Sequence, residues 1–488
     1  MSEPLALLPL AAAAGGGTLG NYEAQQLVAA GLTLLQRCAP LVRALSGRRS
    51  AILLPASPAF LTALAASDGR GAVLVNPLAS PLEIATQLRE ANVGAVFTVT
   101  PLAGRLDGDV PRVLLDDAPR TARYVDAATT RDVDLGRHHG LSIEGKRDVP
   151  GSDEEAAIVF TSAMAGRPLG AVVSHRNLIA NARSTMVAAA NTADDHVLAL
   201  LPFAHLFGLT VTGTAPLLAG ARVTTMDRFN PVRAVELIAG QGITEVVGVP
   251  TVFRALLAAL ERRGGGVGDL RLCICGGAPL PRELQDRWFD VTRVELRQGY
   301  GLTEAAPVCL FNRVDRANVR GALGVPFPGV EVTVREPGAG AAALTPERPA
   351  GSSGEICVRG ENVFAGYLSG GEHGLAVRDG WLYTGDGGTM NADGTVTFEG
   401  VLKRMFTRNG FNIYPEEIRR AVLELAGVTA VAVRAIPEPA REHDIGLTVT
   451  GAVTADEVRA WCARRLSGYK QPTEIAVAAL DASAAGAG

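Results

Sequence analysis

The stretch IVFTSAMAGRPLGAVVSHRNL occupies residues 158–178 and contains two apolar runs separated by a loop with Ser, Gly and Pro. This pattern predicts a buried strand, a loop, a second strand and the start of a helix. A loop of this kind can present backbone N–H groups to a phosphate, and it can equally be an ordinary structural turn. The stretch therefore predicts an α/β fold and leaves the phosphate site as one of two interpretations.

The segments before this stretch alternate between helical and strand patterns. Residues 23–45 carry apolar side chains at helical spacing, and SAILLP at 50–55 is a short apolar strand. A helical pattern begins at Pro58 and leads into the strand pattern GAVLVN at 71–76. The alternation predicts a mainly parallel sheet with helices on its faces, followed by a second α/β block over 156–301.

The remaining segments suggest how the chain is divided. Residues 129–155 are polar and contain several glycines, so they are interpreted as a linker or surface excursion. Beyond about residue 320, short strand patterns are punctuated by Gly and Pro, which predicts a small β-rich unit. We expect an N-terminal domain over 1–402, with two α/β subdomains and this β-rich unit, and a small α/β C-terminal domain over 403–488.

Composition excludes some classes of protein without naming a function. The 488 residues include 46 Lys and Arg against 50 Asp and Glu, which gives a net charge of −4. Hydrophobic residues make up 47% of the chain and charged residues 20%, as in large globular proteins rather than disordered ones. The near-neutral balance argues against a basic face for nucleic acid.

The cysteines and the apolar runs indicate in which cellular compartment to expect the protein. Six cysteines without a Cys-x-x-Cys pair do not indicate a disulfide framework at this length. The apolar N-terminal run carries Glu3 and no basic segment, unlike a signal peptide. Residues 197–221 lack formal charge and are long enough to span a bilayer, but Pro202, His205 and Pro216 favour a buried strand, loop and helix. We expect a cytoplasmic protein without a membrane span.

Six further segments follow one another in a recognisable order. They are LPFAHLFGL at 201–209, CGGAPLP at 275–281, QGYGLTEAAP at 298–307, GWLYTGDGG at 380–388, GVLKRMFTRNGFNIYPEEI at 400–418 and YKQP at 469–472. With the stretch 158–178, they resemble the adenylate-forming (AMP-binding) superfamily of acyl-CoA synthetases, carrier-loading adenylation domains and firefly-type luciferases. The resemblance covers nearly the whole chain. Such proteins use ATP to join a carboxylic acid to AMP, a small mobile C-terminal domain rotates, and a thiol displaces AMP.

The resemblance implies a nucleotide site. Its implied cofactor-binding residues are Thr161, Ser162, Gly166, Gly276, Gly277, Ala278, Tyr300, Gly301 and Asp386. In this arrangement Tyr300 packs on adenine, which suits an aromatic face, and Asp386 accepts hydrogen bonds from both ribose hydroxyls. The implied cofactors are ATP or the AMP moiety of an acyl-AMP, together with coenzyme A and possible Mg²⁺.

The resemblance also implies catalytic positions. Thr303 would donate its hydroxyl toward the α-phosphate, Glu304 would help to place Mg²⁺, and His205 would be the gate beside the carboxylate. Gly410 lies in a loop that resembles the lining of the pantetheine tunnel, where a side chain would obstruct the thiol, although a plain turn also explains this glycine. Lys403 falls at the hinge. Without the resemblance, His205 would be interpreted as a histidine of the core and Glu304 as an acidic residue of the surface.

The sequence indicates the chemical class of the acid substrate but not the particular acid. The candidate residues of the acyl pocket are Phe207, Leu209, Val247, Gly248, Pro250, Ala278, Leu302 and Ala305. They are mostly apolar and favour an aliphatic, alicyclic or aryl acid over a charged amino acid. The sequence shows no carrier domain, so we expect CoA as the acceptor, with a separate carrier protein as the alternative.

The phosphate loop departs from the pattern of the superfamily. The expected Thr-Ser-Gly-Thr-Thr-Gly-x-Pro-Lys-Gly is Thr-Ser-Ala-Met-Ala-Gly-Arg-Pro-Leu-Gly at 161–170. Ala163 restricts a position that favours glycine, residues 164–165 lack hydroxyl donors, and Leu169 replaces a cation. Losing three charge-assisted contacts of about 1.5–3 kcal/mol each would weaken the grip on the β,γ-phosphates. Arg167 is a partial substitute.

Two other expected cations are also absent from the sequence. Val401 replaces the arginine of the hinge motif, and Ala487 stands where the resemblance places the lysine of the adenylation step. Loss of one such stabiliser commonly costs about 10²–10³ in rate. We therefore expect an acyl-CoA synthetase homologue specialised for forming the thioester from an acyl-AMP made elsewhere, with adenylation weak or lost. The alternatives are a complete ATP-dependent acid–CoA ligase and a silent nucleotide-binding partner of an active homologue.

Overall fold

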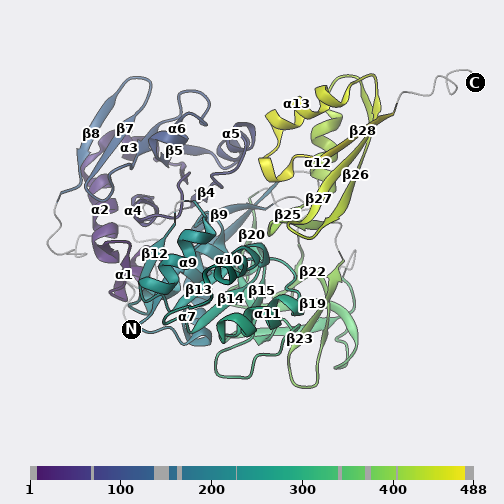
Figure 1. Ribbon diagram of the computed structural model, residues 1–488. Helices are drawn as coiled ribbons and strands as arrows, with labels where there is room; N and C mark the ends of the chain where they lie inside the picture. The colour runs from purple at the N-terminus through teal and green to yellow at the C-terminus, as the bar shows by residue number, and fades with distance from the viewer. Residues whose placement is uncertain are drawn as a thin grey trace, which may run out of the picture.

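A computed structural model describes residues 8–67, 71–136, 153–161, 168–226, 228–338, 343–368, 375–402 and 405–478. It contains two nine-stranded sheets, a five-stranded sheet, a two-stranded hairpin and a three-stranded sheet. We call residues 405–478 the C-terminal unit. In Figure 1 this unit stands at the upper right, where its helix α13 contacts α5 of the N-terminal region. The expected α/β fold class, with a large N-terminal region and a small C-terminal α/β unit, is confirmed.

The first sheet has the strand order β20-β10-β9-β4-β3-β5-β6-β7-β8. Its strands are β3 (Arg49–Ile52), β4 (Ala72–Leu74), β5 (Val93–Thr98), β6 (Arg112–Leu114), β7 (Thr121–Val125), β8 (Thr130–Asp134), β9 (Glu155–Thr161), β10 (Leu169–Ser174) and β20 (Gly366–Tyr367). Strands β9 to β6 run parallel, and both edges are antiparallel. Of the two interpretations of 129–155, a linker or a surface excursion, β8 fits the second, because it is a mostly exposed edge strand that pairs with β7.

The second sheet has the strand order β17-β16-β15-β14-β13-β11-β12-β1-β2. Its strands are β1 (Thr18–Leu19), β2 (Tyr22–Glu23), β11 (His196–Ala199), β12 (Arg222–Thr225), β13 (Glu245–Gly248), β14 (Leu272–Cys275), β15 (Leu296–Gly301), β16 (Val308–Phe311) and β17 (Val325–Pro326). The prediction that the second block begins at 156 is wrong, because β9 pairs with β4 of the first sheet. Apolar periodicity predicts a strand and does not specify which sheet it joins.

Helices cover both sheets. They are α1 (Leu8–Ala14), α2 (Ala24–Arg37), α3 (Ala39–Ala44), α4 (Pro58–Ala66), α5 (Pro81–Glu90), α6 (Thr100–Ala103), α7 (His175–Ala189), η2 (Phe207–Thr214), α8 (Ala215–Leu218), α9 (Pro231–Gly240), α10 (Pro250–Arg263), α11 (Arg282–Thr292) and η3 (Thr303–Ala305). The helix expected over 23–45 is broken at Cys38, because Pro40 lies in the first turn of α3 and has no N–H to continue α2. Within the described residues, none of the helices has the length and apolar character needed to cross a bilayer.

The last part of the chain forms the β-rich unit and the C-terminal unit. The β-rich unit contains β18 (Val330–Arg335), β19 (Ser353–Gly360), β21 (Val377–Arg378), β22 (Trp381–Met390) and β23 (Val396–Val401). The C-terminal unit contains β24 (Phe406–Arg408), β25 (Phe411–Ile413), α12 (Pro415–Leu423), β26 (Val428–Glu438), β27 (Glu442–Gly451), α13 (Ala455–Arg465), η4 (Gly468–Lys470) and β28 (Glu474–Ala478). Ile418, Val422 and Leu447 belong to a hydrophobic core of its own. The domain boundary at 402/403 stays a prediction.

A buried polar cluster lies at the amino ends of the parallel strands of the second sheet. Arg271 donates to both oxygens of Asp195 at 2.7 Å, and Asn191 donates to Glu245 at 2.8 Å. Burial raises the pKa of Glu245 to about 8. In α/β sheets ligands bind beyond the carboxyl ends of the strands, so this cluster lies at the end away from a ligand site.

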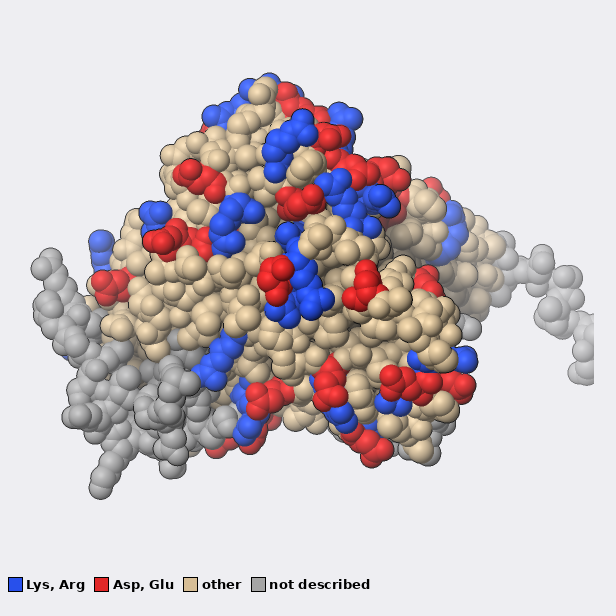
Figure 2. All heavy atoms as spheres, turned by 90° about the horizontal axis from the view of Figure 1, so that it is seen from below, with Lys and Arg blue, Asp and Glu red and all other residues tan. Residues whose placement is uncertain are grey.

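Charged side chains of both signs are mixed on one face of the molecule (Figure 2). Figure 2 shows one face on which Lys and Arg are interspersed with Asp and Glu rather than gathered into a field of one sign. Many of the ion pairs are exposed; Arg359 and Glu331, for example, are 43% and 62% exposed at their side chains. Such pairs contribute at most about 1 kcal/mol each to stability, so the fold rests on its buried apolar cores.

Candidate active site

A cavity of about 480 Å³ lies where the two large sheets, the β-rich unit and the C-terminal unit meet. The predicted site residues that line it are Thr161, His205, Gly277, Ala278, Tyr300, Gly301, Leu302, Thr303, Glu304, Asp386 and Gly410. Gly276, Phe207, Val247 and Pro250 are not among the lining residues. Ser162, Gly166 and Lys403 lie outside the described residues. The fold thus brings together residues that are up to 249 positions apart.

A tyrosine and an aspartate join two sheets at this cavity. Tyr300 lies next to the last residue of β15 and donates its hydroxyl to Asp386 of β22 at 2.7 Å. Burial, and then the Asp386 carboxylate, raise the pKa of Tyr300 well above its ordinary value, so the phenol stays protonated and donates. The pair places an aromatic ring and a carboxylate side by side.

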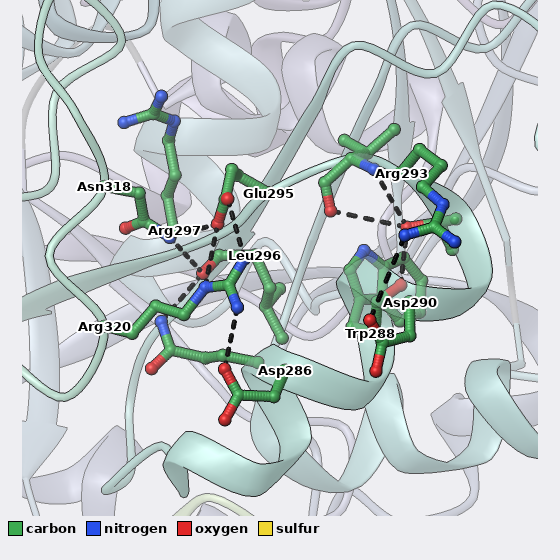
Figure 3. A network of polar contacts seen from close by, with 12 residues as sticks. Asp286, Trp288, Asp290, Arg293, Glu295, Leu296, Arg297, Asn318 and Arg320 are labelled. Atoms are coloured by element: carbon green, nitrogen blue, oxygen red, sulfur yellow. Dashed lines mark hydrogen bonds and ion pairs between the residues drawn. The ribbon is translucent and has the colours of Figure 1, made fainter.

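The strand that carries Tyr300 is anchored at its other end by the polar network of Figure 3. Arg320 donates to Asp286 at 2.7 Å and to Glu295 at 2.8 Å, and Asn318 donates to Glu295 at 2.7 Å. Asp286 belongs to α11, while Glu295 directly precedes β15. The network therefore ties a helix to the strand that ends in the cavity.

A second tyrosine contacts the acid expected to place a metal ion. Glu304, on the short helix η3, accepts a hydrogen bond from the Tyr367 hydroxyl at 2.7 Å. Burial, followed by the nearby Glu304 charge, raises the pKa of Tyr367. Sequence reasoning missed Tyr367, because it lies in a two-residue strand 63 positions from its partner.

The predicted gate histidine faces the cavity. His205 directly follows the buried Ala204 and lies at the start of the turn that leads into η2. His205 is exposed to the space of the cavity, and partial shielding of the imidazole from bulk solvent there lowers its pKa. The neutral form is therefore favoured at His205.

The loop after β14 forms one wall. Gly277 has a φ of +79°, a left-handed conformation that suits glycine, and lines the cavity with Ala278. Gly276 lies behind them: a methyl group there would come within 3.0 Å of both the Gly299 carbonyl oxygen and the Phe207 ring. Close packing thus explains the glycine at 276, and Phe207 backs this wall from outside the cavity.

The C-terminal unit contributes the turn between β24 and β25. Gly410 in this turn has a φ of +76°, and its N–H donates to Glu442 at 3.0 Å. A methyl group on Gly410 would lie 2.8 Å from the Val249 side chain. The Gly410 carbonyl oxygen also approaches the Cβ position of Gly277 to within 4.0 Å. The turn is therefore packed against the wall of the cavity.

In the described part of the phosphate loop, the position expected to hold a lysine is apolar. Leu169, where the resemblance places a lysine, is buried in β10 and lines the cavity. Its carbonyl oxygen accepts a hydrogen bond from the Thr161 hydroxyl at 3.4 Å. The departures at 162–167 lie outside the described residues, as does Ala487.

Lys470 is the one Lys or Arg among the described residues that line the cavity. Its ammonium donates to Glu83 at 2.7 Å and to Glu417 at 2.6 Å, and its side chain is 6% exposed. Burial alone would lower the pKa of Lys470, but the two carboxylates outweigh it and raise that pKa. The positive charge of Lys470 is therefore already paired with two carboxylates. Glu83 belongs to α5, so the cluster also fastens the C-terminal unit to the N-terminal region.

Comparison with known proteins agrees with this geometry. A family model described as AMP-binding enzyme matches residues 38–368. Feruloyl-CoA synthase from an Amycolatopsis species is 33% identical over 447 residues, which cover 88% of this chain and 84% of that protein. The chain is thus similar over most of its length to a protein named for a CoA thioester.

Solved structures show the same architecture. A malonyl-CoA ligase in a ternary product complex with methylmalonyl-CoA and AMP is 28% identical, with a TM-score of 0.77 over 98% of this chain and 99% of that one. A double mutant of o-succinylbenzoate CoA synthetase from Bacillus subtilis has a TM-score of 0.79 over 98% and 95% of the two chains. At 22% identity, the second likeness shows the fold alone.

Proposed function

We propose that this member of the AMP-binding enzyme family is specialised for the thioester-forming half-reaction. The premise is that the chain is an acid–thiol ligase of the acyl-CoA synthetase type. It would take an acyl-AMP and CoA, and its adenylation of a free acid by ATP would be weak or lost. The observation that carries this proposal is that Lys470, the one Lys or Arg in the described lining, is already paired with Glu83 and Glu417.

The residues suited to an acyl-AMP are present. The Tyr300 ring offers an apolar face for adenine, the Asp386 carboxylate can accept from ribose hydroxyls, and Thr303 offers a hydroxyl to a phosphate. An acyl-AMP carries a single phosphate. It therefore demands less positive charge from the protein than the triphosphate of ATP does.

Among the described residues that line the cavity, few are suited to a triphosphate. Leu169 stands in the wall where an ammonium would meet the β- and γ-phosphates, and the Glu83, Glu304 and Asp386 carboxylates line the same cavity. Each charge-assisted hydrogen bond that is lost costs about 1.5–3 kcal/mol of binding. Binding of ATP in a productive position is therefore expected to be weak.

A Mg²⁺ ion would be held by Glu304 together with phosphate oxygens. The described residues contain no cluster of three or more His, Cys, Asp or Glu side chains that could bind a metal by itself. Mg²⁺ is often held by one or two carboxylates and by substrate phosphates, so Glu304 fits that role. The ion would neutralise phosphate charge and would depend on the nucleotide for its place.

The thiol would enter beside the turn that carries Gly410. Gly410 packs closely against Val249 at the edge of the cavity, so any side chain there would push the turn out of place. Thioester formation mainly requires a thiol to be positioned against an already activated mixed anhydride. We assign this step to the arrangement of the two regions in which Lys470 of the C-terminal unit pairs with Glu83 of the N-terminal region. Rotation of residues 403–488 about Lys403 is part of the same proposal.

The acid would be aliphatic, alicyclic or aryl. The wall beside His205 is formed by small or apolar residues, including Pro202, Ala204, Ala278 and Leu302. The similarity to feruloyl-CoA synthase supports an aryl acid among these classes. A separate adenylating homologue would supply the acyl-AMP. The six free cysteines, all buried, fit a reducing compartment such as the cytoplasm.

The test is a direct assay of the second half-reaction. Purified protein is mixed with CoA and with either feruloyl-AMP or octanoyl-AMP, and acyl-CoA is measured by chromatography. Thioester well above the rate in buffer supports the proposal. Binding of acyl-AMP without any thioester would point to a silent nucleotide-binding protein, and rapid thioester formation from free acid, ATP and CoA would point to a complete ligase.

A further inference from the structure

A histidine of the C-terminal unit lines the cavity and has no part in the function proposed above. His443 lies in β27 and is half-buried. It lines the cavity together with Phe406, Thr407 and Gly410 of the β24–β25 hairpin. The histidine is therefore on the same side of the cavity as the turn beside which the thiol would enter.

The ring of His443 is held in one orientation. Its Nδ1 lies 3.0 Å from the carbonyl oxygen of Thr407, and its ring packs edge-on against Phe406 with centroids 5.5 Å apart. A carbonyl oxygen only accepts hydrogen bonds, so Nδ1 must carry the proton. In the neutral ring, Nε2 then has a free lone pair. Among the described residues, no hydrogen-bond partner is found for Nε2.

The residues on either side of His443 hold the turn in place. Arg441 accepts from the Asn409 N–H at 3.1 Å through its carbonyl oxygen, and Glu442 accepts from the Gly410 N–H at 3.0 Å. Residues 441–443 thus contact Asn409, Gly410 and Thr407 of the hairpin. The position of the imidazole is coupled to that of Gly410, which packs against Val249 at the cavity wall.

The thiol step needs a base. A free thiol has a pKa of about 8.5, so only a few per cent is thiolate at neutral pH, and the thiolate is the nucleophile. We propose that His443 is the general base for the thiol of CoA, an inference that rests on the thioester-forming function proposed above. Imidazole is the side chain that most often takes up a proton in this pH range.

The step balances as follows. The S–H bond of the thiol breaks, and its proton goes to Nε2 of His443, which becomes imidazolium. The sulfur forms a bond to the acyl carbon of the acyl-AMP, and the C–O bond to the phosphate then breaks, so that AMP leaves with the electron pair. The imidazolium finally gives its proton to solvent. The products are acyl-CoA and AMP, and no oxidant or further reactant is required.

Charged groups near His443 lie on its own strand and the adjoining turn, on two neighbouring strands and on α10. On its own strand and the preceding turn these are Arg441, Glu442 and Asp444; β24 contributes Arg408, β26 contributes Glu438 opposite Glu442, and α10 contributes Arg254, whose charge acts on Glu442. Both Arg408 and Arg441 pair with Asp444, at 3.0 Å and 3.1 Å. Burial raises the pKa of Glu442, whose Oε2 is occupied by the Gly410 N–H.

His205 is a less suitable base for the thiol. It lies in the N-terminal region at the acyl side of the cavity, next to Ala204, rather than on the hairpin. Partial shielding from bulk solvent lowers the pKa of the His205 imidazole, which weakens it as a proton acceptor. His443, in contrast, arrives at the cavity together with the turn beside which the thiol enters.

The test compares wild type with His443→Asn at two pH values. Asparagine can keep a donor near the Thr407 carbonyl, but it has no basic nitrogen. Thioester formation from feruloyl-AMP and CoA is measured at about pH 7 and at about pH 9.5, where the thiol ionises without help. We expect a loss of about 100-fold near pH 7, which is typical of a general base, and nearly equal rates at the higher pH. Added imidazole is expected to restore part of the lost rate at neutral pH.

Other results would contradict the proposal. An equal loss at both pH values would mean that His443 only supports the hairpin, and no loss at either pH would mean that another group takes the proton. His443→Gln, which keeps the length of the side chain, must show the same pH dependence if His443→Asn proves unstable. Failure of the wild type to form thioester at either pH would overturn the proposed function itself, an outcome distinct from both.

Discussion

Replacing Gly410 with alanine perturbs the proposed thiol route at one point. The new Cβ would lie 2.8 Å from Val249 Cγ1 and 3.1 Å from its Cβ, closer than the optimum of about 3.5–4.0 Å between carbon atoms. The turn must therefore move by roughly 0.7 Å or more. In addition, the φ of +76° costs a non-glycine residue about 1–2 kcal/mol.

The displacement is expected to affect catalysis more than binding. A misplacement of about 1 Å at a reacting centre can cost about 100-fold in rate, and we expect a loss of this size in thioester formation from feruloyl-AMP and CoA. Affinity for AMP, measured by calorimetry, is expected to stay unchanged, because Tyr300 and Asp386 belong to other elements.

Gly394 provides a matched control. It has a φ of +81° in the turn between β22 and β23, and a methyl group there would meet nothing within 4 Å. Gly394→Ala should carry the same backbone cost of about 1–2 kcal/mol without the clash, measured by thermal unfolding, and should leave the thioester rate intact. The double variant Gly410→Ala with Val249→Ala should recover part of the rate. Equal rate losses in the two alanine variants, or a fully active Gly410→Ala, would refute the assigned route.

Three further predictions test the site and its support. Asp386→Asn should weaken binding of AMP by about 1.5–3 kcal/mol in calorimetry; unchanged affinity would remove Asp386 from the site. Because the native state holds a proton on Glu245 up to about pH 8, against an ordinary pKa of 4.5, the free energy of unfolding should fall as pH rises between these values. In Glu245→Gln, the free energy of unfolding measured by urea denaturation should differ less between about pH 5 and about pH 8 than in wild type. An unchanged difference would contradict the raised pKa of Glu245. Lys470→Met leaves Glu83 and Glu417 uncompensated and should cost about 3–5 kcal/mol of unfolding free energy, which Glu417→Gln should partly restore. A variant as stable as wild type would show that the cluster does not hold the unit.

The fold was predictable where local patterns are strong. Pro58 begins a helix as the pattern indicated, and residues 197–221 form a strand, a turn and helices, close to the expected strand, loop and helix. The sheet to which β9 belongs was not predictable, since Ile158 pairs with Val73 through contacts that any apolar strand could make. Local periodicity specifies an element, whereas long-range packing specifies its neighbours.

The site divides in a similar way. The motif order indicated Tyr300 and Asp386, which the structure joins across 86 positions. Lys470 lay in a quoted motif, but its partner Glu83 is 387 positions away and has the sequence signature of a helix cap after Ser80. Glu83 does complete that cap. Its second role, as a partner of Lys470, depends on how the C-terminal unit packs against α5 and could not be recognised from the sequence.

The central claim is that this chain retains the second half-reaction and has lost most of the first. The direct measurement compares the two on one sample: pyrophosphate exchange into ATP with a free acid, and acyl-CoA formation from the AMP ester of the same acid. We expect acyl-CoA formation to exceed exchange by at least about 100-fold, the rate effect of losing one electrostatic stabiliser. Exchange as fast as thioester formation, or exchange alone, would contradict the account.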